Sequence, residues 1–296
     1  MSGLVDELAY LVLDVIDVEA WERFAAEVLG AGVEREGASL KVRLDARPFR
    51  YLIRRGPSGA LPALGWLATS PAALSTICAR LSEQGLTFAP IGATDCAERR
   101  ADAGVSFVCR NGIRHEVVLG LGEGARYQPS GKVSGFVTGA GGLGHVVWGA
   151  PDLEAMDALM IGAFEMALRE NISTPSGIGH FYGCNPRHHS LATFTAPALR
   201  LEHVMVEMSD LDDVGEALDR AIDGGYVVSQ PMGRHRTDHM VSGYVEAPGG
   251  LGVEIGCGGV LCGDDWADVR EANRRRPWGH GAAMRRHHKA AQAAAD

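Results

Sequence analysis

The feature of this sequence that most constrains its fold is an internal repeat. Leu8–Ala20 reads as a short apolar strand, an Asp and the start of an amphipathic helix, and Leu143–Ala155 follows the same plan. In each copy the Asp, Asp17 or Asp152, suits a helix N-cap because its carboxylate can accept hydrogen bonds from the free amides of the first turn. A repeat of this kind indicates that a supersecondary unit has been duplicated.

A second pair of similar stretches lies downstream of the first. Leu64–Ala68 and Leu201–Met208 each read as a strand that leads to a helix, the first ending near Gly85 and the second at Gly224-Gly225. The earlier two helices are predicted over residues 21–29 and 156–167, and short alternating strands over 40–44, 105–108, 180–182, 243–245 and 253–255. The pattern predicts an α+β fold of four βαβββ modules paired into two similar domains, although a generic ferredoxin-like repeat would read in the same way.

The boundary between the two domains is predicted within Tyr127–Lys132, where turn-forming and polar residues suit a linker. We expect residues 1–131 to form an N-terminal domain without metal and residues 132–296 a catalytic domain. A basic C-terminal tail, from about residue 263, contains Arg274–Arg276 and Arg285–Lys289 and is interpreted as a solvated chain end.

Composition narrows the classes of function. The net charge is −9 and the pI is about 5.7, which argues against nucleic acid as a partner because phosphate binding needs a basic surface. No apolar run approaches the ~20 residues that span a bilayer, so no membrane association is expected. The six cysteines contain no CxxC pair, which favours free thiols in a reducing compartment and predicts a cytoplasmic protein.

The two halves of the repeat differ in the residues that could bind a metal. Strands of the C-terminal half carry His145, His203 and Glu254 at matching positions. In the N-terminal half, Tyr10 stands at the position of His145 and Glu116 at that of Glu254. Trp66 stands near the position of His203, if a slip of one residue is allowed.

Two neutral imidazoles and one carboxylate on one face of a metal form the facial triad of non-haem iron(II) oxygenases, and manganese(II) suits the same ligands. The set leaves positions open, which a reaction between an organic substrate and dioxygen requires. The alternative is that His145 and His203 are ordinary core or surface histidines. Their equivalent repeat positions argue against it, as does Glu254 in an apolar strand, where an unpaired carboxylate would be costly.

Five blocks of sequence carry a resemblance to a known family. They are Gly142–His145, Cys184–Ala192, Glu202–Met205, Leu211–Val214 and Gly233–Glu254. The C-terminal half is similar to the type I extradiol dioxygenases of the vicinal oxygen chelate superfamily, in particular to 2,3-dihydroxybiphenyl 1,2-dioxygenases. The last block nearly satisfies the signature of that family and is highly specific.

The resemblance extends over the chain to about Gly259, although the N-terminal half matches mainly through Leu8–Tyr10 and Trp21–Gly30. One departure lies inside the signature. Gly243 stands where the family usually has a bulky apolar residue before the tyrosine, and the sequence leaves its effect on the wall of the substrate pocket open.

This resemblance implies a vicinal oxygen chelate (glyoxalase-like) fold and an extradiol ring-cleaving dioxygenase of aromatic degradation. Its cofactor would be Fe(II), with Mn(II) second, held by His145, His203 and Glu254. Its substrates would be a substituted catechol and O2, and it would form a homo-oligomer.

The resemblance also implies roles for residues that do not bind the metal. His189 would be the acid/base beside the substrate, and only the family alignment selects it over its neighbour His188. His235 and Tyr244 would hydrogen-bond a substrate hydroxyl, and Asp238 would orient the site from behind. A His that is neutral near pH 7 can take a proton and later return it.

Two other functions fit the same repeat. A metal-dependent glyoxalase-type lyase would share the fold, but Tyr10 and Trp66 leave the N-terminal half poor in ligands. A non-enzymatic binding protein would have no need of His145, His203 and Glu254 together. Metal analysis separates an enzyme from a binder, and product colour with catechol separates a dioxygenase from a lyase.

Overall fold

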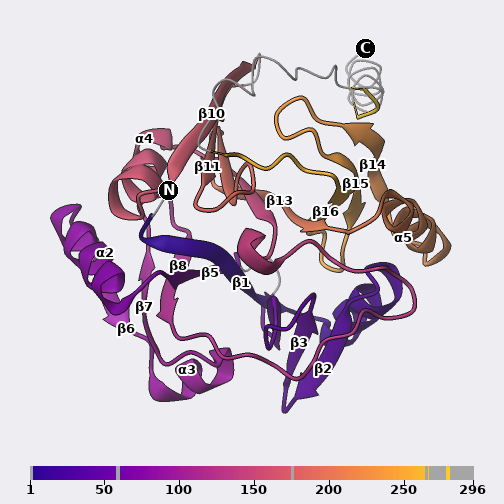
Figure 1. Ribbon diagram of the computed structural model, residues 1–296, viewed down its shortest axis with the longest axis horizontal. Coiled ribbons are helices and arrows are strands. Elements are labelled where there is room, and N and C mark those ends of the chain that lie inside the picture. The colour runs from indigo at the N-terminus through magenta and orange to yellow at the C-terminus, as the bar shows by residue number, and fades with distance from the viewer. Residues whose placement is uncertain (1–2, 58–60, 175–176, 264–265, 267–277, 281–296) are drawn as a thin grey trace.

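The computed structural model describes residues 3–57, 61–174, 177–263, 266 and 278–280, and the statements below refer to these residues. The first half of the chain forms two βαβββ modules (Figure 1). Their elements are β1 (Val5–Val15), α1 (Val18–Arg23), the π-helical turn η1 (Phe24–Val28), β2 (Gly32–Glu36), β3 (Ser39–Arg43), β4 (Tyr51–Arg55), β5 (Ala63–Ala68), α2 (Pro71–Glu83), β6 (Phe88–Pro90), α3 (Ala93–Arg99), β7 (Ala103–Val108) and β8 (Arg114–Leu119).

The second half repeats this arrangement after a short 3-10 turn, η2 (Gly139–Gly141). Its elements are β9 (His145–Ala150), α4 (Leu153–Asp157), the π-helical turn η3 (Ala158–Ala163), β10 (Ala167–Thr174), β11 (Gly177–Gly183), β12 (Leu191–Thr195), β13 (Arg200–Glu207), α5 (Leu211–Asp223), β14 (Val228–Arg234), β15 (Val241–Glu246) and β16 (Gly252–Cys257).

Each half builds one eight-stranded mixed sheet, and the two sheets have the same strand order. The orders are β2-β3-β4-β1-β5-β8-β7-β6 and β10-β11-β12-β9-β13-β16-β15-β14. Helices α2, α3 and α5 lie at the periphery of the view in Figure 1. The predicted α+β fold of four βαβββ modules is therefore confirmed. The predicted domain boundary at residue 131 falls between the last strand of the first sheet and the first strand of the second, and stays a prediction.

The helix caps follow the sequence prediction. The carboxylates of Asp17 and Asp152 accept hydrogen bonds from the amides of Ala20 and Ala155, each at 2.8 Å, and both helices then widen into a π-helical turn. The helix predicted over residues 156–167 ends earlier than expected. Glu165 adopts a left-handed conformation with φ 56°, which ends the helix, and β10 begins two residues later. Helix α3 and the strands β2, β4, β6, β10, β12 and β14 were not among the predicted elements.

The hydrogen-bond register corrects one of the predicted correspondences. Tyr10 and His145 occupy equivalent positions, because Tyr10 pairs with Gly65 of β5 and His145 pairs with Met205 of β13. Glu116 and Glu254 are also equivalent, because they pair with the same two residues from the neighbouring strand. The predicted match of Trp66 to His203 is wrong. In the second sheet, His203 pairs with the residue two positions after His145. In the first sheet, the residue two positions after Tyr10 pairs with Ala63, so Ala63 is the equivalent of His203.

Trp66 therefore lies on the other face of the first sheet from Ala63. Successive side chains of a strand alternate between faces, and an odd offset along β5 reverses the side. Trp66 belongs to the large core cluster, whereas Ala63 belongs to a smaller cluster with Tyr10 and Val12. Strand β5 is apolar on both faces, so the sequence alone did not reveal the shift.

The large core joins the two sheets. Phe164, which follows η3 of the second half, packs against Trp66 and Phe107 of the first half with ring centroids 5.7 and 6.3 Å apart. The indole N–H of Trp66 donates to Nδ1 of His115 at 3.0 Å, and burial lowers the pKa of His115 to about 3. His115 is thus a neutral core residue that positions the halves against each other.

In the first sheet, a buried guanidinium neutralises the carboxylate that corresponds to Glu254. Nε of Arg99, from α3, lies 2.6 Å from Oε2 of Glu116, and Nη2 lies 2.9 Å from Oε1. The hydroxyl of Tyr10 donates to Oε2 at 2.8 Å, and the exposed Arg114 reaches Oε1. The charge and the hydrogen-bonding capacity of Glu116 are therefore matched by the guanidinium of Arg99 and the hydroxyl of Tyr10.

None of the described helices is long and apolar enough to cross a membrane. All six cysteines are free thiols, as the sequence predicted, and four of them are buried. The two basic clusters of the predicted C-terminal tail, Arg274–Arg276 and Arg285–Lys289, lie outside the described residues.

We predict that Arg99→Ala lowers the free energy of unfolding by about 3–5 kcal/mol, because it leaves a buried carboxylate without its cation. The matched control is Arg114→Ala, which removes an exposed contact to the same carboxylate and costs about 1 kcal/mol or less. Urea unfolding measures both. Equal losses for the two variants would contradict this account of Glu116.

Candidate metal centre

Three side chains converge on the inner face of the C-terminal sheet. His145 begins β9, His203 lies in β13 and Glu254 lies in β16, and these strands are neighbours in the order β9-β13-β16. Oε2 of Glu254 lies 3.1 Å from Nε2 of His145 and 3.1 Å from Nε2 of His203, and the two nitrogens are 3.4 Å apart. The structure thus brings together the three residues that the sequence selected as ligands.

The spacing of these atoms fits a metal ion. With metal–ligand distances of about 2.1 Å, adjacent ligands at an octahedral centre are about 3.0 Å apart, close to the three separations observed. Two imidazoles and one carboxylate also match the donor set of a facial triad. A divalent cation would offset the charge of Glu254, whose side chain is only 1% exposed.

The second oxygen of Glu254 is held from outside this group. Oε1 accepts hydrogen bonds from the hydroxyl of Ser242 at 2.5 Å and from Nε2 of His235 at 3.0 Å. Burial by itself would raise the pKa of Glu254, but hydrogen bonds from His145, His203 and His235 hold that pKa well below its usual value. The carboxylate is therefore ionised and fixed in orientation, as a metal ligand needs to be. Ser242 lies inside the Gly233–Glu254 block, but the sequence analysis assigned it no role.

His189 lies in the polar turn between β11 and β12 and faces the candidate ligands. Its ring stacks on that of His145 with centroids 4.0 Å apart, and a T-shaped contact with Phe181 covers it at 5.0 Å. Burial, followed by the nearby His145 and His188, lowers the pKa of His189 well below 6.5. His189 is consequently neutral near pH 7 and able to accept a proton.

His235 and Tyr244 form a second polar pair beside the site. His235 follows β14, and its Nε2 lies 2.8 Å from the hydroxyl of Tyr244 in β15. Burial works against a charged imidazole, but the hydrogen bond and the charge of Glu254 raise the pKa of His235 to about 9. Burial and the same carboxylate raise the pKa of Tyr244 well above 10. Both groups can therefore donate hydrogen bonds at neutral pH.

Asp238 belongs to a second group with metal-binding donors. Its carboxylate, one ring nitrogen of His145 and one of His189 lie within 4.8 Å of one another. Oδ1 of Asp238 accepts a hydrogen bond from the amide of Met240 at 3.1 Å. The donor atoms of the Glu254 group are closer together than this limit and match ligand spacing, so that group is the better candidate.

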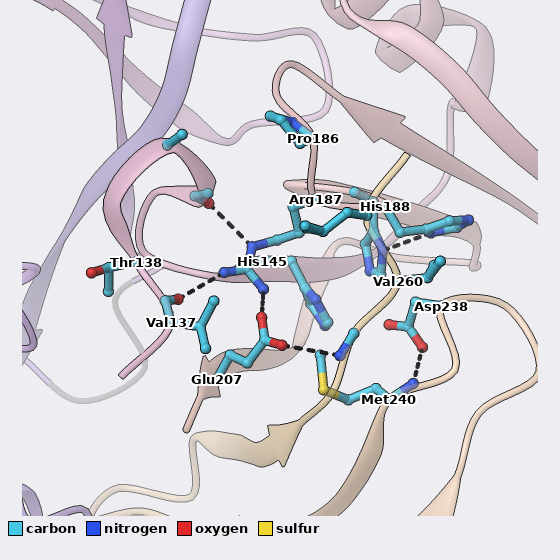
Figure 2. A pocket seen from close by; sticks show the side chains of 15 residues that line it. Val137, Thr138, His145, Pro186, Arg187, His188, Glu207, Asp238, Met240 and Val260 are labelled. Carbon is cyan, nitrogen blue, oxygen red and sulfur yellow. Dashed lines mark hydrogen bonds and ion pairs between the residues drawn. The ribbon is translucent and has the colours of Figure 1, made fainter. Parts of the chain in front are cut away.

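A cavity of about 210 Å³ opens beside His145 and His189 (Figure 2). Its wall includes Asp238, Met240 and a buried ion pair between Arg187 and Glu207. Arg187 also donates to the carbonyls of Val137 and Gly141, and the amide of Gly259 donates to Glu207. The pair therefore ties three loops together at this end of the sheet.

The sequence did not identify two residues near the chain end that pack against the site. Nε2 of His280 donates to the carbonyl of Ser242 at 2.7 Å, and its ring centroid lies 4.4 Å from that of His235. The indole of Trp266 packs against His188 at 5.1 Å. Neither residue has a motif around it that could be matched, and only the tertiary structure brings them to these positions.

Gly243 is not among the residues that line the cavity beside His145 and His189. A Cβ at this position would lie 2.8 Å from Cδ1 of Leu218, which is on α5. Tyr244, the next residue, is the one that faces the site, because neighbouring side chains of a strand alternate. The glycine therefore permits close packing of helix against sheet, and it does not shape the site.

Comparisons with known proteins agree with this geometry. Residues 142–255 match the Glyoxalase/Bleomycin resistance protein/Dioxygenase superfamily, and residues 8–56 match the first domain of the dihydroxybiphenyl dioxygenase BphC. The chain is 34% identical, over 93% of its length and 97% of the relative, to an iron-dependent extradiol dioxygenase of Rhodococcus jostii (strain RHA1). The chain belongs to the extradiol dioxygenase family.

Other members of the extradiol dioxygenase family are similarly related. A biphenyl-2,3-diol 1,2-dioxygenase of Paraburkholderia xenovorans (strain LB400) is 32% identical over 93% of this chain and 95% of that protein. The crystal structure of BphC, a halotolerant catechol dioxygenase, superposes with a TM-score of 0.86 at 31% identity, covering 94% of each chain. A Mn(II)-bound glyoxalase from Novosphingobium aromaticivorans, at 20% identity and a TM-score of 0.75 over 88% of this chain and 84% of that one, shares the fold alone.

We predict that His145→Ala, His203→Ala and Glu254→Ala each lower the affinity for a divalent metal by more than about tenfold while the chain stays folded. Asp238→Asn is the matched control, because it alters the second group and should keep the metal. Metal content after dialysis and far-UV circular dichroism measure the two quantities. Loss of metal in Asp238→Asn with retention in Glu254→Ala would reverse the assignment.

Proposed function

We propose that this member of the family is an Fe(II)-dependent extradiol dioxygenase that inserts both atoms of O2 into a substituted catechol and opens its ring. The observation that carries the proposal is a two-histidine, one-carboxylate group with a neutral, buried His189 stacked on one of its members. The iron-dependent relative, 34% identical over nearly the whole chain, supports Fe(II) over Mn(II).

The ligands would be His145, His203 and Glu254, which together carry one negative charge. Bound iron(II) would lower the pKa of a coordinated hydroxyl and leave positions open for two further ligands. Ser242 and His235 hold Oε1 of Glu254, so Oε2, the proposed ligand atom, is oriented before the metal binds.

His189 would act as the acid/base. It is neutral at pH 7, and its 4.0 Å stacking on His145 places its ring beside the open side of the ligand group. A neutral imidazole there can take a proton from a substrate hydroxyl and return it later in the reaction.

His235 and Tyr244 would orient the substrate. The Nε2–H of His235 is shared between Oε1 of Glu254 and the hydroxyl oxygen of Tyr244, which leaves the phenolic hydrogen of Tyr244 free to donate to a substrate oxygen. Asp238 is buried behind His145 and His189, where its charge would favour the protonated form of either imidazole. It would therefore support His189 while that residue carries the proton.

The surroundings of the site suit an aromatic substrate. Val147, Phe181 and Ala192 form an apolar cluster on the face of the sheet that carries the ligands, and Ile172 and Phe194 pack against it. Such a surface favours the ring and any apolar substituent of a catechol. The predicted homo-oligomer and cytoplasmic location stay predictions.

The proposed activity predicts equimolar consumption of O2 and catechol. The iron-loaded protein is mixed with a panel of substituted catechols without oxygen, and air is then admitted while O2 uptake and the colour of the product are recorded. Apolar substituents should give the highest kcat/KM. Substrate loss without O2 uptake would identify a lyase, and binding without turnover would identify a binding protein.

We predict that His189→Gln keeps its iron but opens the ring about 10²–10⁴-fold more slowly, because it lacks the group that moves the proton. Tyr244→Phe removes one hydrogen bond worth about 0.5–1.5 kcal/mol, or up to about 3 to a charged catecholate, and should act more mildly. Turnover per bound iron is the quantity to compare. Normal turnover per iron in His189→Gln would place the acid/base role on another residue.

A further inference from the structure

His188, the neighbour of the proposed acid/base, makes a contact that the proposed mechanism does not use. Its side chain is 1% exposed, and its Nδ1 lies 3.1 Å from Nδ1 of His189. The dashed line beside His188 in Figure 2 marks this contact. Two ring nitrogens at this distance share one hydrogen, so one of them must donate and the other must accept.

The other nitrogen of His188 faces a carboxylate. Nε2 lies 3.5 Å from Oε2 of Glu170, whose side chain is 12% exposed. Among the described residues, neither of these two buried atoms has a hydrogen-bond partner of its own. Leaving both without a partner would be costly, so their contact with each other, with Nε2 as donor and the carboxylate oxygen as acceptor, is the interaction that compensates their burial.

The fold fixes this geometry from two sides. Glu170 in β10 stands opposite Phe181 in β11, and Phe181 contacts both His188 and His189. Residues opposite each other in an antiparallel pair point to the same face, so Glu170 reaches the histidines from the sheet. Trp266 closes the other side of His188 with ring centroids 5.1 Å apart.

The chemistry of these atoms determines which nitrogen carries the hydrogen. The carboxylate of Glu170 presents an acceptor to Nε2 of His188, so with one hydrogen on the ring that hydrogen lies on Nε2 and Nδ1 is the bare acceptor. Nδ1 of His189 must then be the donor. A neutral His189 with its hydrogen on Nδ1 has a bare Nε2 on the opposite side of the ring, as a general base requires.

We propose that Glu170 and His188 are positioning residues that fix His189 in the tautomer with a bare Nε2. This inference rests on the proposed function only for its effect on turnover. The hydrogen positions follow from the contacts of Glu170, His188 and His189, whatever reaction the site performs.

Two substitutions of His188 separate its two contacts. The amide of His188→Asn replaces Nδ1, and its oxygen can accept from His189. The amide of His188→Gln replaces Nε2, so it keeps a donor toward Glu170 and loses the acceptor. We expect His188→Asn to keep turnover within about twofold, and His188→Gln to lower kcat per iron by about 10–100-fold with KM and iron content unchanged.

A double-mutant cycle tests the carboxylate. Glu170→Ala should lower kcat per iron in the parent protein and have no further effect in His188→Asn, because an amide has no tautomer to be fixed. His180→Gln is the control. It removes a part-buried histidine–carboxylate contact, made by Nδ1 of His180 with Asp157, that does not touch His189, and it should leave kcat unchanged. Equal losses for Asn and Gln at position 188, or additive losses in the cycle, would overturn the proposal.

Nitrogen NMR of the metal-free protein, labelled with ¹⁵N-histidine, provides a readout that does not depend on activity. We expect His189 to carry its hydrogen on Nδ1 in the parent protein and to lose this preference in His188→Gln. Hydrogen on Nε2 of His189 in the parent protein would overturn the positioning role and leave the proposed dioxygenase activity standing. Absence of ring opening together with the expected tautomer would overturn the proposed function alone.

Discussion

The rest of the site depends on the burial of one carboxylate, Glu254, in strand β16 of the C-terminal sheet. An ionised carboxylate without partners is strongly disfavoured there, so the surrounding strands supply a hydrogen-bond donor or a cation for each oxygen. Ser242 and His235 hold Oε1, and His145 and His203 face Oε2 across a space that suits a divalent metal. The same contacts that make burial tolerable thus also create and orient the candidate ligand set.

The N-terminal sheet solves the same problem in another way. Glu116 occupies the position equivalent to Glu254, but Arg99 brings a guanidinium into the place where a metal would otherwise be needed. Tyr10 replaces His145 and donates its hydroxyl to the carboxylate. One duplicated fold therefore contains two buried carboxylates with different counter-charges. The guanidinium of Arg99 belongs to the chain and only neutralises its carboxylate, whereas a metal would leave coordination positions free for substrates.

The repeat made much of this predictable from the sequence. Asp caps, strand periodicity and the contrast between the halves predicted four modules and brought His145, His203 and Glu254 to one place, because these are local signals that duplication repeats. Register was not predictable: Trp66 and Ala63 both lie in the apolar strand β5, and only the ladder shows which one corresponds to His203. Contacts made by tertiary packing were also missed, as with the hydroxyl of Ser242 and the ring of His280.

The most direct test of the account is the position of the metal. Crystals of the protein loaded anaerobically with Fe(II) can be measured on both sides of the iron absorption edge, which locates iron and distinguishes it from manganese. The account predicts one anomalous peak within about 2.0–2.3 Å of Nε2 of His145, Nε2 of His203 and Oε2 of Glu254. A peak held by His189 and Asp238 in place of His203 and Glu254, or one beside Glu116 in the N-terminal sheet, would contradict it.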